Sequence, residues 1–375
     1  MNTNKTNRIR NRRFAIGAAL TLSLVAGACS SDEDSAATTT APAVTTASST
    51  ASTTAAGGST APDGKAPSFI YITPTTIGPN KFLELGKTGT DAAAAQLGGT
   101  SKTFESTDLN SRRANLEAAV EEKPSIIILT TFDFLDLSSE FATANPNQEF
   151  ILIDTCPEAP PSNLHCGVFR ENEMSYLLGV MAGSLSKSGK VGSVGALDIP
   201  FIHRFTDSFA LGAASVNPDA TDSQVFIGGD NPFADPATAK EQTLALNAQG
   251  ADQIFAAGSG SNGGVFEAAA EGGFFAYGSD VNQCALAPGH IVDNALKLVD
   301  VLTEQLIDQV LKGTAGPIVS FGLAEGGVGV VALQDDVASS GCVIADHPDV
   351  IAAVAKARDG IIDGSIVVPD PVTAG

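Results

Sequence analysis

The side chains that most often carry chemistry are few and scattered in this sequence. Its four histidines lie far apart, and no Ser-His-Asp or Cys-His arrangement is evident. The stretch Gly86-Lys87-Thr88 imitates the end of a phosphate-binding loop, but Lys81 stands where that loop requires a glycine. The Gly-rich segment 325–331 has no helix start behind it to hold a phosphate. The sequence therefore predicts no enzyme, no metal site and no cofactor.

One cysteine near the N-terminus has a context that suggests chemical modification. A basic head with no acidic residue precedes an apolar run over residues 14–25, which is the layout of a secretory signal peptide over residues 1–28. Small residues then precede Cys29, and this arrangement resembles the lipobox of bacterial lipoproteins, whose cysteine receives lipid before the signal is removed. We therefore expect Cys29 to carry a lipid anchor. The alternative is an ordinary signal peptide whose cleavage site contains a cysteine.

The segment after Cys29 has the composition of a disordered linker. Residues 30 to about 65 are mostly Ser, Thr, Ala, Gly and Pro, which cannot bury enough apolar surface to offset the entropy of ordering. Residues 29–65 are therefore expected to be an anchor and a flexible linker. Together they would hold a folded body at the outer face of the cell membrane.

The charge of the chain excludes two classes of partner. Without the five basic residues of the signal peptide, 16 basic residues face 42 acidic ones, a net charge of −26. Such a field repels nucleic acid and anionic lipid headgroups. No later apolar run approaches the ~20 residues that a spanning helix needs. We therefore expect no nucleic-acid partner, and membrane attachment through the lipid anchor only.

Four further cysteines lie in the body of the chain: Cys156, Cys166, Cys284 and Cys342. An even number in an exported protein indicates two disulfides, for which sequence allows three connectivities. Cys156 and Cys166 flank a Pro-rich loop and are the first choice for one pair, which leaves Cys284 and Cys342 for the other. Four buried free thiols are the alternative.

The elements that must position any site alternate regularly. Apolar runs of strand length cover residues 68–74, 125–131, 149–155, 190–196, 223–229, 252–258 and 274–280. Helix-like segments cover roughly residues 80–97, 110–122, 172–187, 201–216, 235–249, 262–272 and 290–312. Strands that are apolar on both faces and alternate with helices indicate parallel sheets. The pattern predicts an α/β protein with two doubly wound, Rossmann-like lobes.

Ligands of open parallel sheets bind beyond the carboxyl ends of the strands. The candidate ligand-binding segments are therefore those that follow the apolar runs. They are residues 75–81, 132–134, 198, 228–233, 258–262 and 280–283.

The second half of the chain has a specific likeness to a known family. The segment "FRENEMSYLLGVMAGSLSKSGKVGSVGALDIPFIHRFTDSFALGAASVNPD" (169–219) resembles the signature region of the basic membrane protein family. The likeness continues through residues 235–269, 278–289, 294–300 and 325–331 and spans roughly residues 66–335.

Members of that family are lipid-anchored, extracytoplasmic solute-binding proteins of ABC importers, and some are purine nucleoside receptors. The resemblance implies a type I periplasmic-binding-protein fold, with two lobes, three hinge crossings and a cleft that closes on a small molecule. It implies partners in a permease and an ATPase, and a monomeric receptor. We expect lobe 1 over residues 66–170 with part of about 285–315, and lobe 2 over residues 171–284 with much of about 316–375.

The resemblance also implies ligand-binding residues in the second lobe. Phe233 matches an aromatic residue that stacks on the base, and Asp280 with Lys297 matches a carboxylate and a lysine that hold ribose hydroxyls. Asp280 stands at the end of the strand run over 274–280, whereas Lys297 is expected early in a helix over 290–312. A buried loop aromatic and a solvated surface lysine are the alternatives for Phe233 and Lys297. Asp198 is a further candidate that is equally suited to cap the next helix.

The first lobe departs from the nucleoside-binding pattern. Lys87 stands where the family has a second aromatic residue, and its acidic pair and polar base-recognition residues are also replaced. Lys87 itself is a candidate contact, and replacement contacts are expected from Asn80, Asp108 or the loop with Phe132, Asp133 and Phe134.

Three functions stay open. The first is a receptor for a nucleoside or other ribose-bearing solute, and the second is a receptor of the same fold for a different small metabolite. The third is a tethered sensor or surface interaction protein without a transport role.

Overall fold

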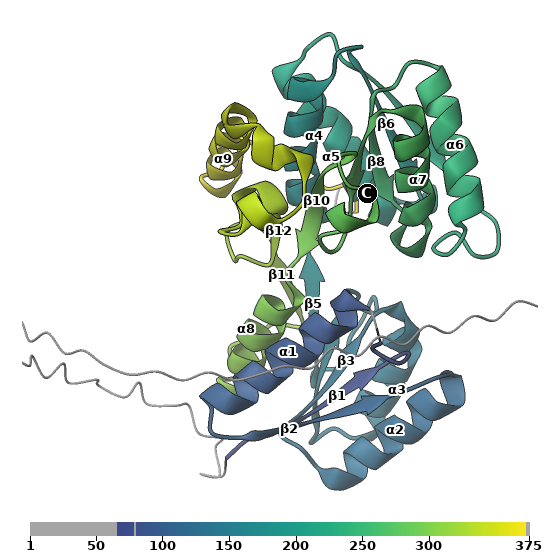
Figure 1. Ribbon diagram of the computed structural model, residues 1–375. Helices are drawn as coiled ribbons and strands as arrows, with labels where there is room; N and C mark the ends of the chain where they lie inside the picture. Colours follow the sequence, from purple (N-terminus) through teal and green to yellow (C-terminus); the bar gives the residue numbers. More distant parts are fainter. Residues whose placement is uncertain (1–65, 79, 373–375) are drawn as a thin grey trace, which may run out of the picture. The chain divides into compact units, whose positions relative to one another are not determined.

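The computed structural model describes residues 66–78 and 80–372, so the predicted signal peptide, Cys29, the linker and Pro79 lie outside the described residues. Figure 1 shows two lobes, each with one sheet, linked by several passages of the chain.

The first sheet has six strands in the order β11-β5-β4-β3-β1-β2, all parallel. Their bounds are β1 Ser68–Thr73, β2 Thr100–Glu105, β3 Ile126–Thr130, β4 Glu149–Ile153, β5 Leu164–Phe169 and β11 Ile318–Phe321. The helices of this lobe are α1 Lys81–Gln96, α2 Leu109–Glu122, α3 Leu135–Ala144 and α8 Val299–Leu311.

The second sheet also has six strands, in the order β12-β10-β9-β8-β6-β7. Their bounds are β6 Lys190–Gly195, β7 Thr221–Phe226, β8 Gln253–Ala257, β9 Phe275–Gly278, β10 Ile291–Lys297 and β12 Val328–Val330. The helices are α4 Glu171–Leu185, α5 Pro200–Val216, α6 Pro236–Ala248, α7 Asn262–Gly272 and α9 Pro348–Ile362. Numbered within each lobe, the strands follow the same order in both sheets; only β12 differs, because it pairs antiparallel with β10. The predicted α/β architecture with two sheets is confirmed.

The close packing of α5 against α4 fixes the position of α5. Pro200 begins α5, where a backbone N–H has no partner within the helix. Gly179 of α4 allows the two backbones to meet, since a Cβ there would lie 2.0 Å from the carbonyl oxygen of Phe209. A side chain at Gly179 would therefore push α5 away from α4.

The expected helix over residues 290–312 is wrong for its first part and confirmed for its second part. The segment forms strand β10, buried over its whole length, and then helix α8. Asp293 looks like a solvated helical residue, but its carboxylate accepts backbone N–H bonds from Val331 at 2.8 Å and Ala332 at 2.7 Å. These partners are 38 and 39 residues away in sequence, so no local pattern reports them. Strands β2, β5, β11 and β12 and helices α3 and α9 were not predicted either.

The chain passes between the lobes three times, after β5, after β10 and after β11. The first sheet therefore includes β11, and the second includes β10 and β12. This exchange is more detailed than the prediction, which assigned part of about 285–315 to the first lobe and much of about 316–375 to the second.

Both predicted cysteine pairs lie in bonding geometry. The Cα atoms of Cys156 and Cys166 are 5.5 Å apart, and those of Cys284 and Cys342 are 5.0 Å apart. We predict that non-reducing peptide mapping of the exported protein will show these two pairs. Opening either bridge should lower the free energy of unfolding by roughly 2–5 kcal/mol. Four alkylatable thiols in natively exported protein would contradict the prediction.

Candidate ligand-binding cavity

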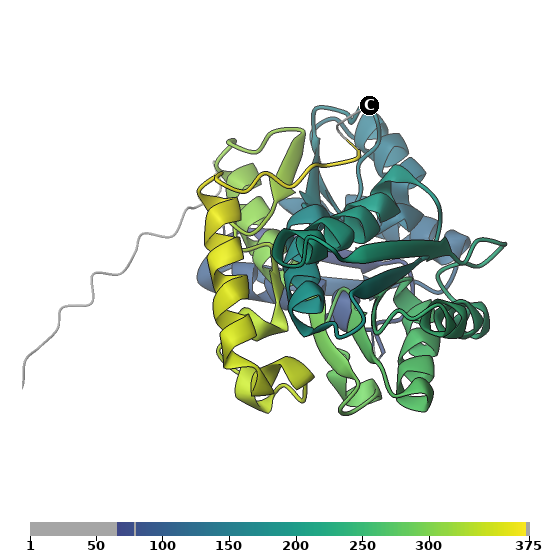
Figure 2. The same cartoon turned by 90° about the horizontal axis from the view of Figure 1, so that it is seen from above.

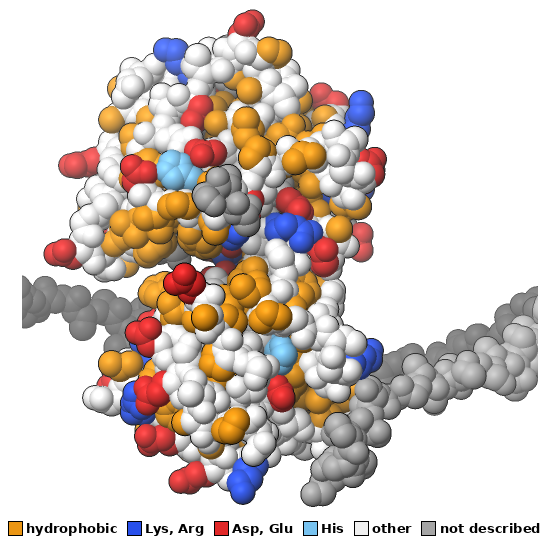
Figure 3. Space-filling view, turned by 180° about the vertical axis from the view of Figure 1, so that it is seen from behind, with side chains coloured by type: hydrophobic (Ala, Val, Ile, Leu, Met, Phe, Trp, Pro, Cys, Tyr) orange, Lys and Arg blue, Asp and Glu red, His pale blue; other side chains and the backbone are white. Residues whose placement is uncertain are grey.

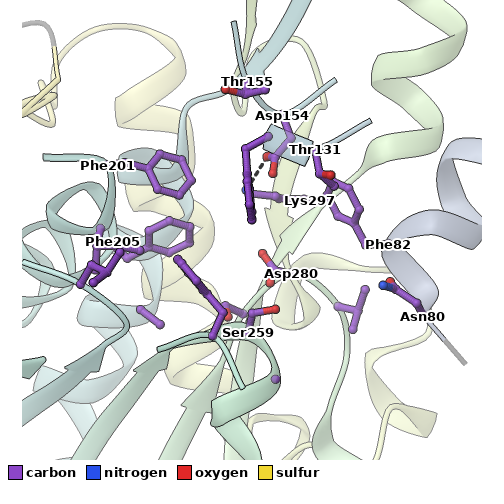
Figure 4. Close-up of a pocket in the computed structure, with 18 of the residues that line it drawn as sticks. Asn80, Phe82, Thr131, Asp154, Thr155, Phe201, Phe205, Ser259, Asp280 and Lys297 are labelled. Atoms are coloured by element: carbon purple, nitrogen blue, oxygen red, sulfur yellow. Dashed lines mark hydrogen bonds and ion pairs between the residues drawn. The ribbon is translucent and has the colours of Figure 1, made fainter. Parts of the chain in front are cut away.

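A cavity of about 900 Å³ lies at the carboxyl ends of strands from both sheets (Figure 4). This volume suits a small organic ligand. Its walls combine aromatic rings with a few charged side chains. The residues used below that line it are Asn80, Phe82, Thr131, Phe132, Asp154, Phe201, Phe205, Phe233, Ser259, Asp280 and Lys297.

Lys297 is the last residue of β10 and is only 3% exposed, so it is not a surface lysine. Its Nζ lies 2.6 Å from Oδ1 of Asp154 and 3.1 Å from Oε1 of Glu171. Figure 4 shows the contact with Asp154 as a dashed line. Among the described residues only the contact with Asp154 has hydrogen-bond geometry, so the ammonium, which has three donors, is able to donate to a ligand as well.

The charges of this cluster perturb one another. Burial alone would lower the pKa of Lys297, but the carboxylates of Asp154, Glu171 and Asp280 outweigh burial and raise it above its ordinary value. Burial raises the pKa of Glu171 and of Asp280, and the Lys297 ammonium opposes both shifts. The lysine therefore stays charged, and its ammonium favours the ionised form of the buried carboxylates against the effect of burial.

Asp280 follows β9, the strand whose place in the second sheet matches that of β4 in the first. Asp154 directly follows β4, and Asp280 is the second residue after β9, so equivalent strands of the two lobes present carboxylates on either side of Lys297 (Figure 4). Asp154 accepts from the lysine, whereas the Asp280 carboxylate accepts no hydrogen bond from any residue of 66–78 or 80–372. Asp280 is therefore the carboxylate available to a ligand.

The backbone is strained at the same place. Among the described residues, five non-glycine residues have positive φ, and four of them line the cavity. They are Thr131 after β3, Asp154 after β4, Ser259 after β8 and Asp280 after β9, with φ values of 71°, 78°, 52° and 71°. Such conformations cost about 1–3 kcal/mol each and concentrate at functional sites. They follow equivalent strands of the two lobes, which indicates one site built from both.

Two aromatic rings from opposite lobes face each other at the cavity. Phe132, in the turn after β3, is 67% exposed, and its ring centroid lies 6.5 Å from that of Phe233, with 34° between the ring planes. Figure 3 shows hydrophobic side chains gathered along the hollow between the lobes. Phe201 and Phe205 of α5 lie deeper, each with its ring centroid within 5.7 Å of the Lys297 ammonium. The cavity therefore offers aromatic faces and a carboxylate to the same ligand.

The structure brings five of the predicted ligand residues to this cavity: Asn80, Phe132, Phe233, Asp280 and Lys297. The side-chain oxygen of Asn80 accepts from the backbone N–H of Leu83 and caps α1, which leaves its amide N–H₂ for a ligand.

Asp198 and Lys87 do not line the cavity, and neither do the alternative contacts Asp108, Asp133 and Phe134. The Asp198 side chain is 75% exposed and lies 2.8 Å from Nε2 of His203, although its neighbours Leu197 and Ile199 face the cavity. Lys87 pairs with Asp91 one turn along the exposed side of α1.

Sequence reasoning missed Asp154, Phe82, Phe201 and Phe205 among the lining residues. Asp154 was counted inside the apolar run 149–155, whereas β4 ends at Ile153. The signal was present, because an acidic residue that closes a buried parallel strand lies at the edge where ligands bind.

The charged and aromatic side chains of the cavity are suited to bind a small ligand. No group of three or more His, Cys, Asp or Glu residues within the described ranges is placed to hold a metal ion. A free carboxylate beside a buried ammonium is able to hold hydroxyl groups, and the paired rings are able to stack on a planar group.

Comparisons with known proteins show what this chain is similar to. A sequence model of the family described as "ABC transporter substrate-binding protein PnrA-like" matches residues 69–346. The ABC transporter nucleoside-binding protein BmpA of Lactococcus lactis is 28% identical over 285 residues, which are 71% of this chain and 77% of that protein. The CD4+ T-cell-stimulating antigen of Listeria monocytogenes is 28% identical over 278 residues, 69% of this chain and 74% of that protein.

Among solved structures, an ABC transporter solute-binding protein from Aeropyrum pernix matches with a TM-score of 0.64 and 25% identity, over 81% of this chain and 94% of that chain. A periplasmic ribose ABC transporter protein from Conexibacter woesei, at 14% identity and a TM-score of 0.57, covers 76% of this chain and 96% of that chain and shows a likeness of fold alone.

The family match extends over most of the chain and includes both sheets and the cavity. The fold is that of type I periplasmic binding proteins, and this family comprises solute-binding proteins rather than enzymes. The chain belongs to the Bmp family of substrate-binding proteins of ABC transporters.

Proposed function

We propose that this protein binds a nucleoside or another ribose-bearing solute and delivers it to an ABC importer. The observation that carries the proposal is the Asp280 carboxylate, which lines the cavity beside Lys297 and accepts no hydrogen bond from the described part of the chain. A carboxylate in this position accepts from two vicinal hydroxyls at once.

The paired rings support a ligand with a planar group. Atoms in contact lie about 3.5–4.0 Å apart, so a ring held between Phe132 and Phe233 needs about 7–8 Å between them. Their centroids are 6.5 Å apart, and a widening of about 1 Å would admit a base. In this proposal Phe132 takes the part of the aromatic residue that Lys87 replaces.

The ligand is best identified without assuming its class. The experiment is native mass spectrometry of the folded body, residues 66–375, purified from its natural host, followed by denaturation and identification of what is released. Release of a nucleoside or ribose-bearing solute supports the proposal. A different metabolite would favour the second function, since Leu197, Ile199 and the rings of α5 make one wall of the cavity apolar.

The sequence also supports a place for the protein at the cell surface. We propose that it is a monomer held on the extracytoplasmic face of the cell membrane by lipid on Cys29, and that it works with a permease and an ATPase. Between residues 66 and 372, Pro79 apart, no helix meets the length and apolarity that crossing a bilayer requires.

Cys29→Ala tests the anchor. The variant should be released from the membrane fraction or stay uncleaved, and it should lose metabolic labelling with palmitate, because Cys29 is the proposed attachment point. A matched variant, Ser30→Ala, should be labelled like the native chain. Equal labelling of Cys29→Ala and native protein would rule out lipidation at this residue.

A further inference from the structure

The C-terminal tail, residues 363–372 after α9, is bound to the passage between the lobes. Figure 2 shows it leaving α9 and running across the molecule. Nδ2 of Asn172, in the first turn of α4, donates to the carbonyl oxygens of Val368 at 3.0 Å and Pro369 at 3.3 Å. The tail lies beyond residues 69–346, which the family model matches.

Asp370 of the tail forms an ion pair with Arg204 that contains two hydrogen bonds. Nε and Nη2 of Arg204 each donate to a carboxylate oxygen of Asp370, both at 2.8 Å. The two side chains are 12% and 18% exposed. A bidentate pair of this kind fixes the plane and direction of the guanidinium group.

Arg204 is also linked to Lys297, which lines the cavity, through the carboxylate of Glu171. Its Nη1 lies 3.1 Å from Oε2 of Glu171, whose other oxygen lies 3.1 Å from Nζ of Lys297. Asp370, Arg204, Glu171 and Lys297 therefore form a series of alternating charges from the tail to the cavity. Glu171 and Lys297 are almost fully buried, so water screens this series weakly.

We propose that Arg204 and Asp370 are positioning residues of the ligand site. Glu171 has one oxygen for each cation, so the place of Lys297 depends on where Arg204 holds the other oxygen. Without Asp370, the guanidinium loses two of its acceptors and turns toward Glu171 or solvent. Glu171 then moves relative to Lys297, although neither Arg204 nor Asp370 lines the cavity.

Hydrogen exchange of Asp370→Asn tests this without any ligand. Peptides that contain Lys297 should exchange at least about threefold faster than in the native protein, while peptides of β3 in the first lobe stay unchanged. The matched control is Asp363→Asn, another tail carboxylate, which accepts from the backbone N–H of Ser365 and should leave both peptides unchanged. Native-like exchange at Lys297, or equal acceleration at β3, would overturn the proposal.

A binding measurement extends the test to the site itself and rests on the proposed function. Native protein should bind inosine more tightly than 2′-deoxyinosine, and calorimetry measures this preference as the ratio of the two dissociation constants. In Asp370→Asn this ratio should be smaller than in native protein by about threefold or more. An unchanged ratio would overturn the positioning role. If the native protein binds neither compound, the proposed ligand class fails, and the exchange experiment alone decides the role of Asp370.

Discussion

Asp280→Ala is expected to abolish the preference of this protein for a ribose over its 2′-deoxy analogue. The carboxylate is held beside a buried ammonium by a backbone conformation with positive φ, and it points into the cavity. Two vicinal hydroxyls would make charge-assisted hydrogen bonds to it, shielded from water. Losing them should cost roughly 2–4 kcal/mol, or about a 30- to 1000-fold weaker affinity.

Calorimetry with inosine and 2′-deoxyinosine on native protein and on the variant measures both effects. Asp198→Ala is the matched control, because Asp198 is an exposed carboxylate near the cavity that pairs with His203 instead of lining it. Its affinity should stay within about twofold of native. Native protein that binds both sugars equally would remove the role assigned to Asp280.

Lys297→Met should lower the free energy of unfolding by about 3–5 kcal/mol. The substitution leaves Asp154 without its cation and Glu171 with Arg204 alone, and removal of one member of a buried ion pair carries a penalty of this size. The matched control is Lys312→Met on α8. Lys312 pairs with Asp308, and both side chains are about half exposed, so the loss should stay below about 1 kcal/mol. Denaturant titration of the three proteins provides the comparison.

The stability of Lys297→Met should also depend on pH in a defined direction. Burial raises the pKa of Glu171 and Asp280 in the folded protein, and losing the lysine raises both further. The folded state then binds more protons than the unfolded state, so stability falls as pH rises above the ordinary carboxyl range of about 4. The deficit of the variant should therefore be largest at neutral pH and shrink on acidification. A deficit that is independent of pH would contradict the assigned ion pairs.

The sequence by itself determined the architecture of the two lobes. The run "SIIILTT" is apolar on both faces, which only a strand covered by helices on both sides satisfies, and it forms the fully buried β3. The same reasoning placed Asp280 and Phe132 just beyond strand ends, where the cavity lies. Local patterns suffice here because burial of a central strand is a property of the whole run.

The tertiary structure alone decided the role of Lys297. Its segment combines charged and apolar residues as a surface helix does, yet it is a buried strand, because distant backbone groups satisfy Asp293 and distant carboxylates satisfy the lysine. Asp154 is 143 residues from Lys297 in sequence. The energy of such a pair depends on the distance between the charges in space and on the exclusion of water. Neither quantity can be predicted from the spacing of the residues in the sequence.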